Sequence, residues 1–393
     1  MFIGYNATSY NHMRNIVGAV PSARYGRVYD VYWLLYALAY RFIRFCGGRP
    51  KGSDFANKFL DAGFHRAKVI HLFNGVSYGK TPWVTTFETL LPRFRCTQSW
   101  QVGMPSVADE PEALRALRKI KGNTCKAIIA MSECAARIQR AFLRQFPRLA
   151  ETIEAKLHVL HPPQPLGIES IQKKAFSEEG PVRFMFVGAS FHRKGGAEVL
   201  ETLAEMRRDY AYPVLLTVVS SLCLDNYATN ETPRDIAEAE RLLVANAGWV
   251  QHFRSLPNAE IVKLMRQHDV GLLPTYADTY GYSVLEFQSC GCPVITTDVR
   301  ALPEINDERC GWVIKAPKNP LGEALYGTPS ERERISEAIR RGMRAAIGQI
   351  FADRAILRVK GEAALMRIRD EHSPTKFAAR LQAIYQAGLT AGV

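Results

Sequence analysis

Two carboxylates, Asp278 and Glu286, stand eight positions apart across a turn that contains Gly281. The turn separates an apolar run, 270–274, which predicts a strand, from a segment, 283–290, which predicts a helix. The N-terminus of such a helix offers backbone N–H groups and the positive end of its dipole to a phosphate. Carboxylates accept hydrogen bonds from sugar or ribose hydroxyls. The spacing therefore predicts a site for a polyhydroxylated, anionic ligand.

A pair of cations follows another apolar run, 182–188, and precedes two glycines. Arg193 and Lys194 stand before Gly195 and Gly196. Such a loop can approach a diphosphate closely, with Arg193 as a bidentate donor and Lys194 as a point charge. The motif alone also fits an exposed turn. Together with acids at the end of another strand of the same sheet, it favours a nucleotide diphosphate.

These residues need a scaffold of alternating strands and helices, which predicts parallel sheets wound by βαβ units. The expected strands are 69–73, 83–87, 127–130, 157–160, 182–188, 213–219, 249–253, 269–274, 293–297 and 311–314. The expected helices are 111–121, 134–145, 195–208, 234–247, 258–268, 283–290, 330–350 and one continuous helix over 356–389. The fold class is α/β, with ligands expected at the carboxyl ends of the strands.

The length of 393 residues indicates two domains. Three prolines within 161–167 and a polar run at 173–180 predict an interdomain linker over about 162–181. We expect an N-terminal domain over 1–163 and a C-terminal domain over 164–371.

Composition is that of a soluble globular chain, with 47% hydrophobic and 23% charged residues. No apolar run is long enough to span a bilayer, and the N-terminus lacks a signal-peptide pattern, so we expect a cytoplasmic protein. The eight cysteines include no CxxC pair, and Cys290 and Cys292 are interpreted as packing residues. We predict neither a metal site nor a cofactor.

Charge is distributed unevenly along the chain. Residues 1–160 hold 23 Lys and Arg against 10 Asp and Glu, a net of +13, whereas residues 161–393 hold 28 against 28. The basic half predicts an anionic partner: nucleic acid, an acidic lipid surface or a phosphorylated glycan. A simple solubilising excess is the alternative. Nucleic acid is disfavoured because no recognisable motif carries interleaved aromatic residues.

The segment 31–45 is apolar and rich in aromatic residues. Arg41 and Arg44 lie near its end, and Arg49 and Lys51 follow it. Its length of about 15 residues is too short to span a membrane. Aromatic side chains beside arginines suit a membrane interface, where the segment would face an anionic surface. A buried core helix of the first domain is the other interpretation, and the two could hold for different faces of the helix.

The motifs of 182–315 resemble the donor domain of retaining GT-B glycosyltransferases of the family 4 type. That domain carries a glutamate, seven residues and a second glutamate, and then Gly-x-Pro-Val-Ile. The matching positions are Asp278, Tyr280-Gly281, Glu286, Gly291-Cys-Pro-Val-Ile295, Pro303-Glu304 and, after the first strand, Lys194-Gly195. Residues 68–160 resemble the family more faintly. The resemblance implies a GT-B fold, in which two Rossmann-like parallel-sheet domains face a central cleft. It implies that 1–163 is the acceptor-side Rossmann-like domain, with a C-terminal helix from about 372 to 393 packing back on it. It also implies that 164–371 is the nucleotide-sugar donor-binding domain.

The resemblance also implies roles for individual residues. Glu286 would bind the ribose hydroxyls, and Asp278 would contact hydroxyls of the donor sugar. Lys194, with Arg193, would neutralise the departing diphosphate without a metal. Backbone N–H groups from Tyr280 to Val284 would hold sugar and phosphate oxygens. The donor-binding set is thus Glu286, Gly281, Tyr280, Tyr282, Ser283, Val284 and Gly188, with His252 at a strand end as a candidate for the base pocket.

The chain departs from the family pattern at several positions. Asp278 stands where the family usually has glutamate, so an altered donor or pose is expected. Ala189 replaces a common arginine, and the glycine-rich loop near Gly4 is missing. Glu88 ends the strand 83–87 where the family often has a donor-facing histidine. Glu88 is either a ligand for a donor or acceptor hydroxyl or an ordinary strand-end acid.

Two further residues, Asn74 and Lys80, follow the strand 69–73 and are candidates for acceptor or donor contacts. His71, within that strand, is interpreted as a packed or hydrogen-bonded residue. The catalytic candidates are therefore Asp278, Lys194, Arg193 and Glu88.

The resemblance implies a glycosyltransferase that moves a sugar from a nucleotide-diphosphate sugar to a glycan or lipid-linked acceptor with retention of configuration. The basic first half favours an acceptor at the inner face of the cell membrane, as in bacterial surface polysaccharide synthesis (lipopolysaccharide, capsule or exopolysaccharide). The alternatives are a GT-B epimerase or phosphorylase and a catalytically degenerate nucleotide-sugar-binding protein.

Overall fold

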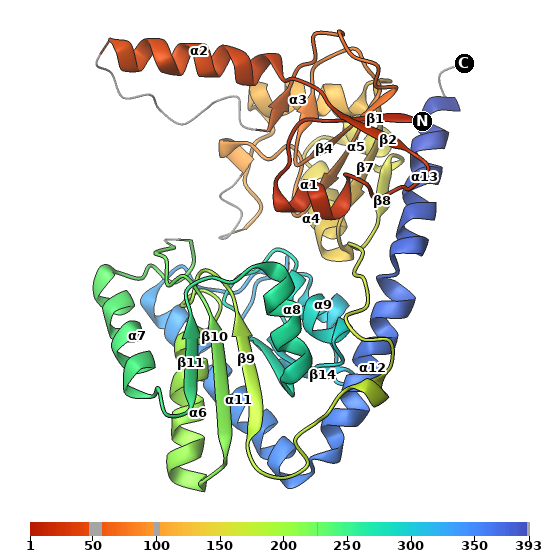
Figure 1. Ribbon diagram of the computed structural model, residues 1–393. Helices are drawn as coiled ribbons and strands as arrows, with labels where there is room; N and C mark the ends of the chain where they lie inside the picture. The colour runs from red at the N-terminus through yellow and green to blue at the C-terminus, as the bar shows by residue number, and fades with distance from the viewer. Residues whose placement is uncertain (47–56, 98–102, 226, 391–393) are drawn as a thin grey trace. The chain divides into compact units, whose positions relative to one another are not determined.

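The computed structural model describes residues 1–46, 57–97, 103–225 and 227–390. The chain divides into two compact units, Met1–Pro163 with Pro374–Val393, and Gln164–Ser373. Each unit is built on one six-stranded parallel sheet flanked by helices (Figure 1). The predicted α/β class with two parallel sheets is confirmed.

The sheet of the first unit has the order β2-β1-β4-β6-β7-β8. Its strands are β2 (Arg24–Arg27), β1 (Phe2–Tyr5), β4 (Val69–Phe73), β6 (Trp83–Phe87), β7 (Cys125–Ala130) and β8 (Leu157–Val159). A separate parallel pair joins β3 (Lys58–Phe59) to β5 (Val76–Ser77). The helices of this unit are α1 (Tyr10–Asn15), α2 (Val31–Phe45), α3 (Pro111–Lys121), α4 (Glu133–Leu143), α5 (Pro147–Glu154), α13 (Pro374–Thr390) and the 3-10 turn η1 (Arg95–Thr97).

Helix α13, although it lies at the end of the chain, packs in the core of the first unit. Its Leu381 and Tyr385 are fully buried beside Ile3, Val69 and other strand residues. A buried hydrogen-bond chain fixes it further. His71 bonds the Tyr385 hydroxyl through Nδ1 at 2.6 Å and the Thr86 hydroxyl through Nε2 at 2.8 Å. The interpretation of His71 as a hydrogen-bonded core residue is therefore confirmed.

Burial, with a smaller contribution from His12, lowers the pKa of His71 to about 3. In the unfolded chain this histidine takes up a proton near pH 6.5, whereas in the folded chain it stays neutral down to about pH 3. The free energy of unfolding is therefore highest above pH 6.5 and decreases as the pH falls from 6.5 toward 3. From pH 7.5 to 5.0, His71 is expected to remove about 2 kcal/mol from the free energy of unfolding. In the variant His71→Gln, urea unfolding of the full chain at both pH values should show a pH dependence smaller by this amount. An unchanged dependence would contradict the assignment.

The sheet of the second unit has the order β11-β10-β9-β12-β13-β14, with parallel neighbours throughout. Its strands are β9 (Val182–Val187), β10 (Val214–Val219), β11 (Val250–Phe253), β12 (Val270–Leu273), β13 (Val294–Thr297) and β14 (Gly311–Ile314). Its helices are α6 (Gly196–Tyr210), α7 (Pro233–Ala245), α8 (Asn258–Gln267), α9 (Tyr282–Ser289), α10 (Leu302–Ile305), α11 (Pro329–Ala352), α12 (Ala355–Glu371) and the 3-10 turn η3 (Ile171–Lys173).

Most strands of the second unit were predictable because they are short apolar runs, and the central ones are buried on both faces, as in parallel sheets, whereas the edge strand β11 is partly exposed. Every residue of β12 and β13 is buried. Helices α7 and α11 begin where their sequences supply capping boxes, Thr232 with Asp235 and Thr328 with Glu331. The observed boundaries lie within one to two residues of those predicted for these four elements.

Two boundary predictions were wrong. The expected continuous helix over 356–389 is two helices, α12 and α13, because Pro374 has no N–H to donate within a continuing helix. Residues 164–181, expected to lie in a linker, belong to the second unit, which begins at Gln164 as the expected second domain does. Within them Ile171 and Lys174 are buried, at 4% and 3% exposure.

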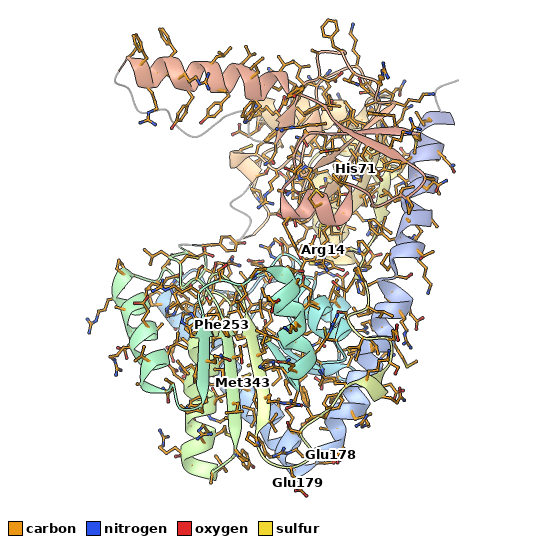
Figure 2. All side chains as sticks on the ribbon, in the orientation of Figure 1. Arg14, His71, Glu178, Glu179, Phe253 and Met343 are labelled. Carbon is orange, nitrogen blue, oxygen red and sulfur yellow. The ribbon has the colours of Figure 1, made fainter. Side chains whose placement is uncertain are left out.

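Helix α2 forms at the residues predicted, but none of its residues is buried. Trp33, Leu38 and Phe42 are 62%, 55% and 68% exposed. The alternative of a buried core helix is therefore wrong for the part of the chain that the structure describes. Figure 2 shows side chains projecting from both sides of this helix.

Candidate functional site

The candidate site lies at the carboxyl edge of the second sheet. The chain enters at β9, continues to β10 and β11 on one side, and then returns to β12 on the other side of β9. The sheet order therefore reverses between β9 and β12. Ligands of open parallel sheets bind at such a switch point, outside the carboxyl ends of the strands. The loop after β9 holds Lys194, and the loop after β12 holds Asp278.

Lys194 and Asp278, 84 residues apart in the chain, form an ion pair. Their side chains are 14% and 13% exposed, so the pair is largely withdrawn from solvent. Gly188 makes room for the lysine, because a Cβ at Gly188 would lie 2.9 Å from the Lys194 Cγ. Asp278 also accepts the Tyr280 N–H at 3.2 Å. The sequence prediction that these residues meet at one edge of the sheet agrees with this geometry.

Burial raises the pKa of the Asp278 carboxyl, but the charge and the hydrogen bond of Lys194 outweigh burial and hold that pKa below its usual value. The carboxylate is therefore charged at neutral pH. Burial lowers the pKa of the Lys194 ammonium, and the charge of Asp278 opposes that shift. Because the carboxylate is charged, the lysine is held as its ion-pair partner. A diphosphate, which carries more negative charge than one carboxylate, can compete for this lysine.

Arg193 occupies a different environment from Lys194. Its guanidinium donates to Asp225 Oδ2 at 2.5 Å, to the Ala277 carbonyl at 2.8 Å and to the Ser190 hydroxyl at 3.1 Å. It also lies 5.8 Å from the centroid of the Tyr227 ring. These bonds hold together the loops after β9, β10 and β12. A diphosphate contact by Arg193 would break bonds to Asp225, Ala277 and Ser190. Lys194 would leave one carboxylate, Asp278, so it is the better placed of the two predicted cations.

Helix α9 carries the second acid. Gly281 precedes the helix in the left-handed region at φ 92°, and a side chain there would lie within 2.6 Å of Leu302 Cδ2. Only glycine adopts this conformation without strain. Glu286 is 6% exposed and accepts from the Asn258 side chain of α8 at 3.3 Å. Asn258 was not identified from the sequence, although it begins the predicted helix 258–268.

The expected row of ligand-facing N–H groups is shorter than predicted. The Val284 N–H donates to the Gly281 carbonyl at 2.9 Å, and the Tyr280 N–H is used by Asp278. Both belong to the turn itself, and Val284 is fully buried. Tyr282 and Ser283, at the first positions of α9, are partly exposed. They are the residues of the predicted row whose position suits a phosphate oxygen.

His252 lies in β11, at the far edge of the same sheet. Its Nε2 atom bonds the Ser220 carbonyl oxygen, which follows β10, at 2.8 Å. The ring is partly exposed. This position at a strand end is compatible with the predicted base pocket.

In the first unit, Asn74 and Glu88 meet at the ends of adjacent strands. The Asn74 amide donates to Glu88 Oε1 at 3.3 Å and accepts the Glu88 N–H at 3.2 Å. Arg93 forms an ion pair with the same carboxylate. Arg93 was not predicted from the sequence, although it lies only five residues after Glu88. Lys80 is exposed on a turn after β5, outside this cluster.

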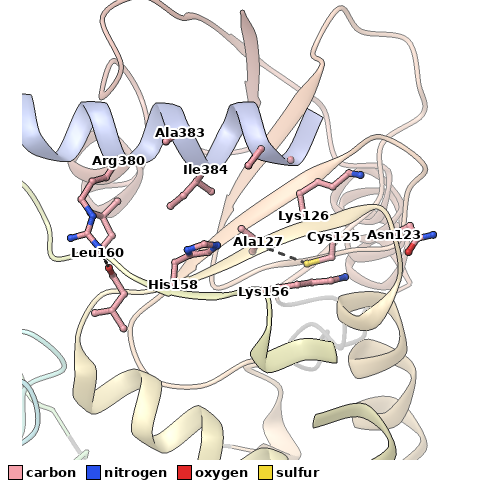
Figure 3. A pocket seen from close by; sticks show the side chains of 13 residues that line it. Asn123, Cys125, Lys126, Ala127, Lys156, His158, Leu160, Arg380, Ala383 and Ile384 are labelled. Carbon is pink, nitrogen blue, oxygen red and sulfur yellow. Dashed lines mark hydrogen bonds between the residues drawn. The ribbon is translucent and has the colours of Figure 1, made fainter. Parts of the chain in front are cut away.

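A cavity of about 560 Å³ lies between β7, β8 and α13 of the first unit (Figure 3). Lys126, Lys156, His158 and Arg380 line it together with apolar residues of α13. Lys156 donates to three backbone carbonyls, and Arg380 donates to the Val159 carbonyl at 3.2 Å. Two of the cations are thus engaged by the protein itself. None of the site residues predicted from the sequence lines this cavity.

Solved structures of glycosyltransferases match both units. The structure of WaaG, a glycosyltransferase involved in lipopolysaccharide biosynthesis, covers 97% of this chain and 99% of its own with a TM-score of 0.56 at 16% identity. The structure of Anabaena HepE in complex with UDP covers 98% of this chain and 99% of its own, with a TM-score of 0.57 at 11% identity. The class that the two parallel units define is the GT-B fold.

Part of the second unit is similar in sequence to known glycosyltransferases. The model of the family described as "Glycosyl transferases group 1" matches residues 167–326. The lipopolysaccharide glucosyltransferase WaaG of Escherichia coli is 33% identical over 158 residues, 39% of this chain and 38% of that protein. The D-inositol 3-phosphate glycosyltransferase of Arthrobacter is 33% identical over 104 residues, 24% of this chain and 25% of that protein. The matches thus span about a quarter to two fifths of these relatives. Over these residues, the second unit of this chain is similar to the group 1 glycosyltransferases.

Proposed function

We propose that the protein is a glycosyltransferase that moves a sugar from a nucleotide-diphosphate sugar to a glycan or lipid-linked acceptor, with retention of configuration. The observation that carries the proposal is the Lys194–Asp278 pair at the switch point of the second sheet, beside α9 with Glu286. The family match over 167–326 covers these residues. The HepE structure contains UDP, and two relatives named above are glucosyl- or glycosyltransferases.

In the proposed reaction, the bond between the sugar anomeric carbon and the diphosphate oxygen breaks while the acceptor hydroxyl oxygen bonds to that carbon. The hydroxyl proton passes to the departing phosphate oxygen, on the same face of the sugar. Lys194 stabilises the charge that develops on the diphosphate, which is the function that a metal serves in other transferases. Asp278 would bind donor hydroxyls once the diphosphate takes the lysine. No side chain acts as a nucleophile.

Within the proposal, Glu286 binds the ribose hydroxyls, and Tyr282 and Ser283 present N–H groups to phosphate oxygens. Arg193 holds the three loops in place and Lys194 carries the charge contact. Asn74 and Glu88 would bind a hydroxyl of donor or acceptor. We place the reaction at the cytoplasmic side of the cell membrane, in the synthesis of a bacterial surface polysaccharide. The name of WaaG as a lipopolysaccharide glucosyltransferase supports this setting.

The test has two stages. UDP-, GDP-, ADP- and dTDP-sugars are first screened by thermal stabilisation of the full chain, since a ligand of the folded state raises the melting temperature by mass action. The selected donor is then incubated with and without membrane glycolipid extract, with and without EDTA. We expect nucleotide release that depends on the extract, resists EDTA and yields an α-linked product from an α-linked donor. Sugar isomerisation without an acceptor would indicate an epimerase, and stabilisation without turnover a degenerate binding protein.

A further inference from the structure

Helix α2 exposes an unusual amount of apolar surface. Its large apolar side chains that are more than a third exposed are Trp33, Leu34, Leu35, Leu38, Tyr40, Phe42, Ile43 and Phe45. A helix that is apolar on all sides is normally buried in a protein core or in lipid. The described part of the first unit does not bury any residue of α2. An exposed surface of this kind indicates an interaction site.

The base of α2 is firmly attached to the first unit. The Asp30 carboxylate caps the helix by accepting the N–H groups of Tyr32 and Leu60, both at 3.0 Å. The Val31 N–H donates to the Leu60 carbonyl at 2.8 Å, and the Tyr32 ring packs edge-on against Tyr78 at 5.9 Å. The start of α2 is therefore fixed beside β3. The exposed remainder of the helix extends from this fixed start.

The dimensions of α2 decide how it can enter lipid. Fifteen residues make a helix about 22 Å long, shorter than the hydrocarbon core of about 30 Å. Among the described residues, no helix is long and apolar enough to cross a membrane. A helix of this length with aromatic residues is suited to lie in the plane of the interface, with its apolar side chains below the headgroups.

The charges of α2 favour an anionic lipid surface over a second copy of the chain. Arg41 and Arg44 are its only charged residues, and both lie near its C-terminal end. Pairing two copies of α2 would bring together helices that contain no carboxylate. Residues 1–160 carry a net charge of +13, which also favours an anionic surface and disfavours a second copy of the same chain. Each Arg near an anionic membrane adds to binding, and such binding falls with salt.

We propose that α2 docks the protein on the headgroup region of an anionic lipid bilayer, with Leu34, Leu38 and Phe42 inserted and Arg41 and Arg44 at the phosphates. The three apolar residues are spaced by four and share one helix face. Docking itself is independent of sugar transfer. Its use, which is to bring the protein to a lipid-linked acceptor, rests on the proposed function.

The test is co-sedimentation of the full chain with two kinds of vesicle. One contains phosphatidylcholine alone, and in the other about one third of the lipid is phosphatidylglycerol. Both are measured at low and at high salt. We expect strong binding to the anionic vesicles at low salt. The triple variant Leu34→Gln, Leu38→Gln, Phe42→Gln should bind more than about 1000-fold less tightly, since each of the three side chains loses most of its free energy of transfer from water. Replacing Arg41 and Arg44 by alanine should cost about 10- to 30-fold on anionic vesicles only.

A matched control uses three exposed apolar residues of helices in the second unit. Val244, Val359 and Met366 are 76%, 66% and 53% exposed, and their replacement by glutamine should leave vesicle binding unchanged. Thermal melts confirm that each variant is folded. Equal binding to neutral and anionic vesicles, or full binding by the α2 triple variant, would overturn the proposal. So would a dimer in solution that the triple variant dissociates, without vesicle binding. Donor stabilisation measured on the same variants should not change, which separates failure of docking from failure of the proposed function.

Discussion

The variant Lys194→Met is expected to reduce sugar transfer by about 100- to 1000-fold, chiefly in kcat. The lysine is the cation placed at the β9–β12 switch point, and removing one preorganised group that stabilises developing negative charge costs this much in other enzymes. Its charge matters more in the transition state than in the bound donor, because the departing diphosphate gains charge as the sugar leaves. The measurement is nucleotide release under saturating donor and acceptor.

The same substitution leaves Asp278 largely buried without its partner, which is expected to destabilise the protein by about 3 kcal/mol. Loss of activity by unfolding must therefore be separated from loss of catalysis. The double variant Lys194→Met, Asp278→Asn removes the unpaired charge and should recover the melting temperature while remaining inactive. Recovery of transfer by the double variant would show that Lys194 has a structural role alone.

A matched control exists in the same unit. Lys173 forms an ion pair with Glu169, four residues earlier, and their side chains are 61% and 82% exposed. Lys173→Met should change neither stability nor transfer measurably, because exposed pairs contribute little. Comparing Lys194→Met with Lys173→Met therefore tests whether the position of the lost charge matters, because both variants lose one positive charge.

The sequence predicted the elements that are defined locally. Strand β9 is a mainly apolar run between Pro181 and Gly188, and β12 lies between Asp269 and Pro274. Helices α7 and α11 carry their own capping residues. The break before Pro374 was missed, although proline forbids a continuous helix, because the apolar spacing continues across it. The short pair β3–β5 has two residues in each strand, too few for a periodic pattern.

The candidate site was predicted as a set of positions without the contacts that determine what each residue can do. Motif spacing identified Lys194, Asp278 and Glu286. It could not show that Arg193 is bound by Asp225, because that contact joins loops 32 residues apart and depends on the order of β9 and β10 in the sheet. Asn258, the partner of Glu286, was missed for the same reason.

The exposure of α2 is a further case in which sequence left two alternatives open. An apolar helix of 15 residues has the same composition in a core and at a membrane interface. Only the three-dimensional structure shows whether the sheet of its own unit covers it. The sheet core is instead filled by α13, which arrives from the other end of the chain.

The variant Glu286→Gln is expected to weaken binding of the selected nucleoside diphosphate about 10- to 100-fold while changing kcat little. A carboxylate that accepts two ribose hydroxyls makes charge-assisted hydrogen bonds, each stronger than those of a neutral amide. Glutamine keeps the shape but loses the charge and brings an NH₂ group toward the Asn258 amide, which already donates at 3.3 Å. Because the ribose is bound equally in the ground and transition states, the loss should appear in KM.

Calorimetry with the nucleoside diphosphate alone, without its sugar, distinguishes ribose binding by Glu286 from a role at the reacting centre. Glu260→Gln on α8 is the control, since that side chain is 55% exposed and pairs with Lys263. A Glu286→Gln variant that binds the nucleoside diphosphate normally but transfers slowly would place the carboxylate at the sugar rather than the ribose. The two acids would then share the sugar. Glu286 is 6% exposed and hydrogen-bonded to Asn258 of α8, whereas Asp278 is paired with Lys194. This geometry favours binding of the nucleoside by Glu286 and of the sugar by Asp278.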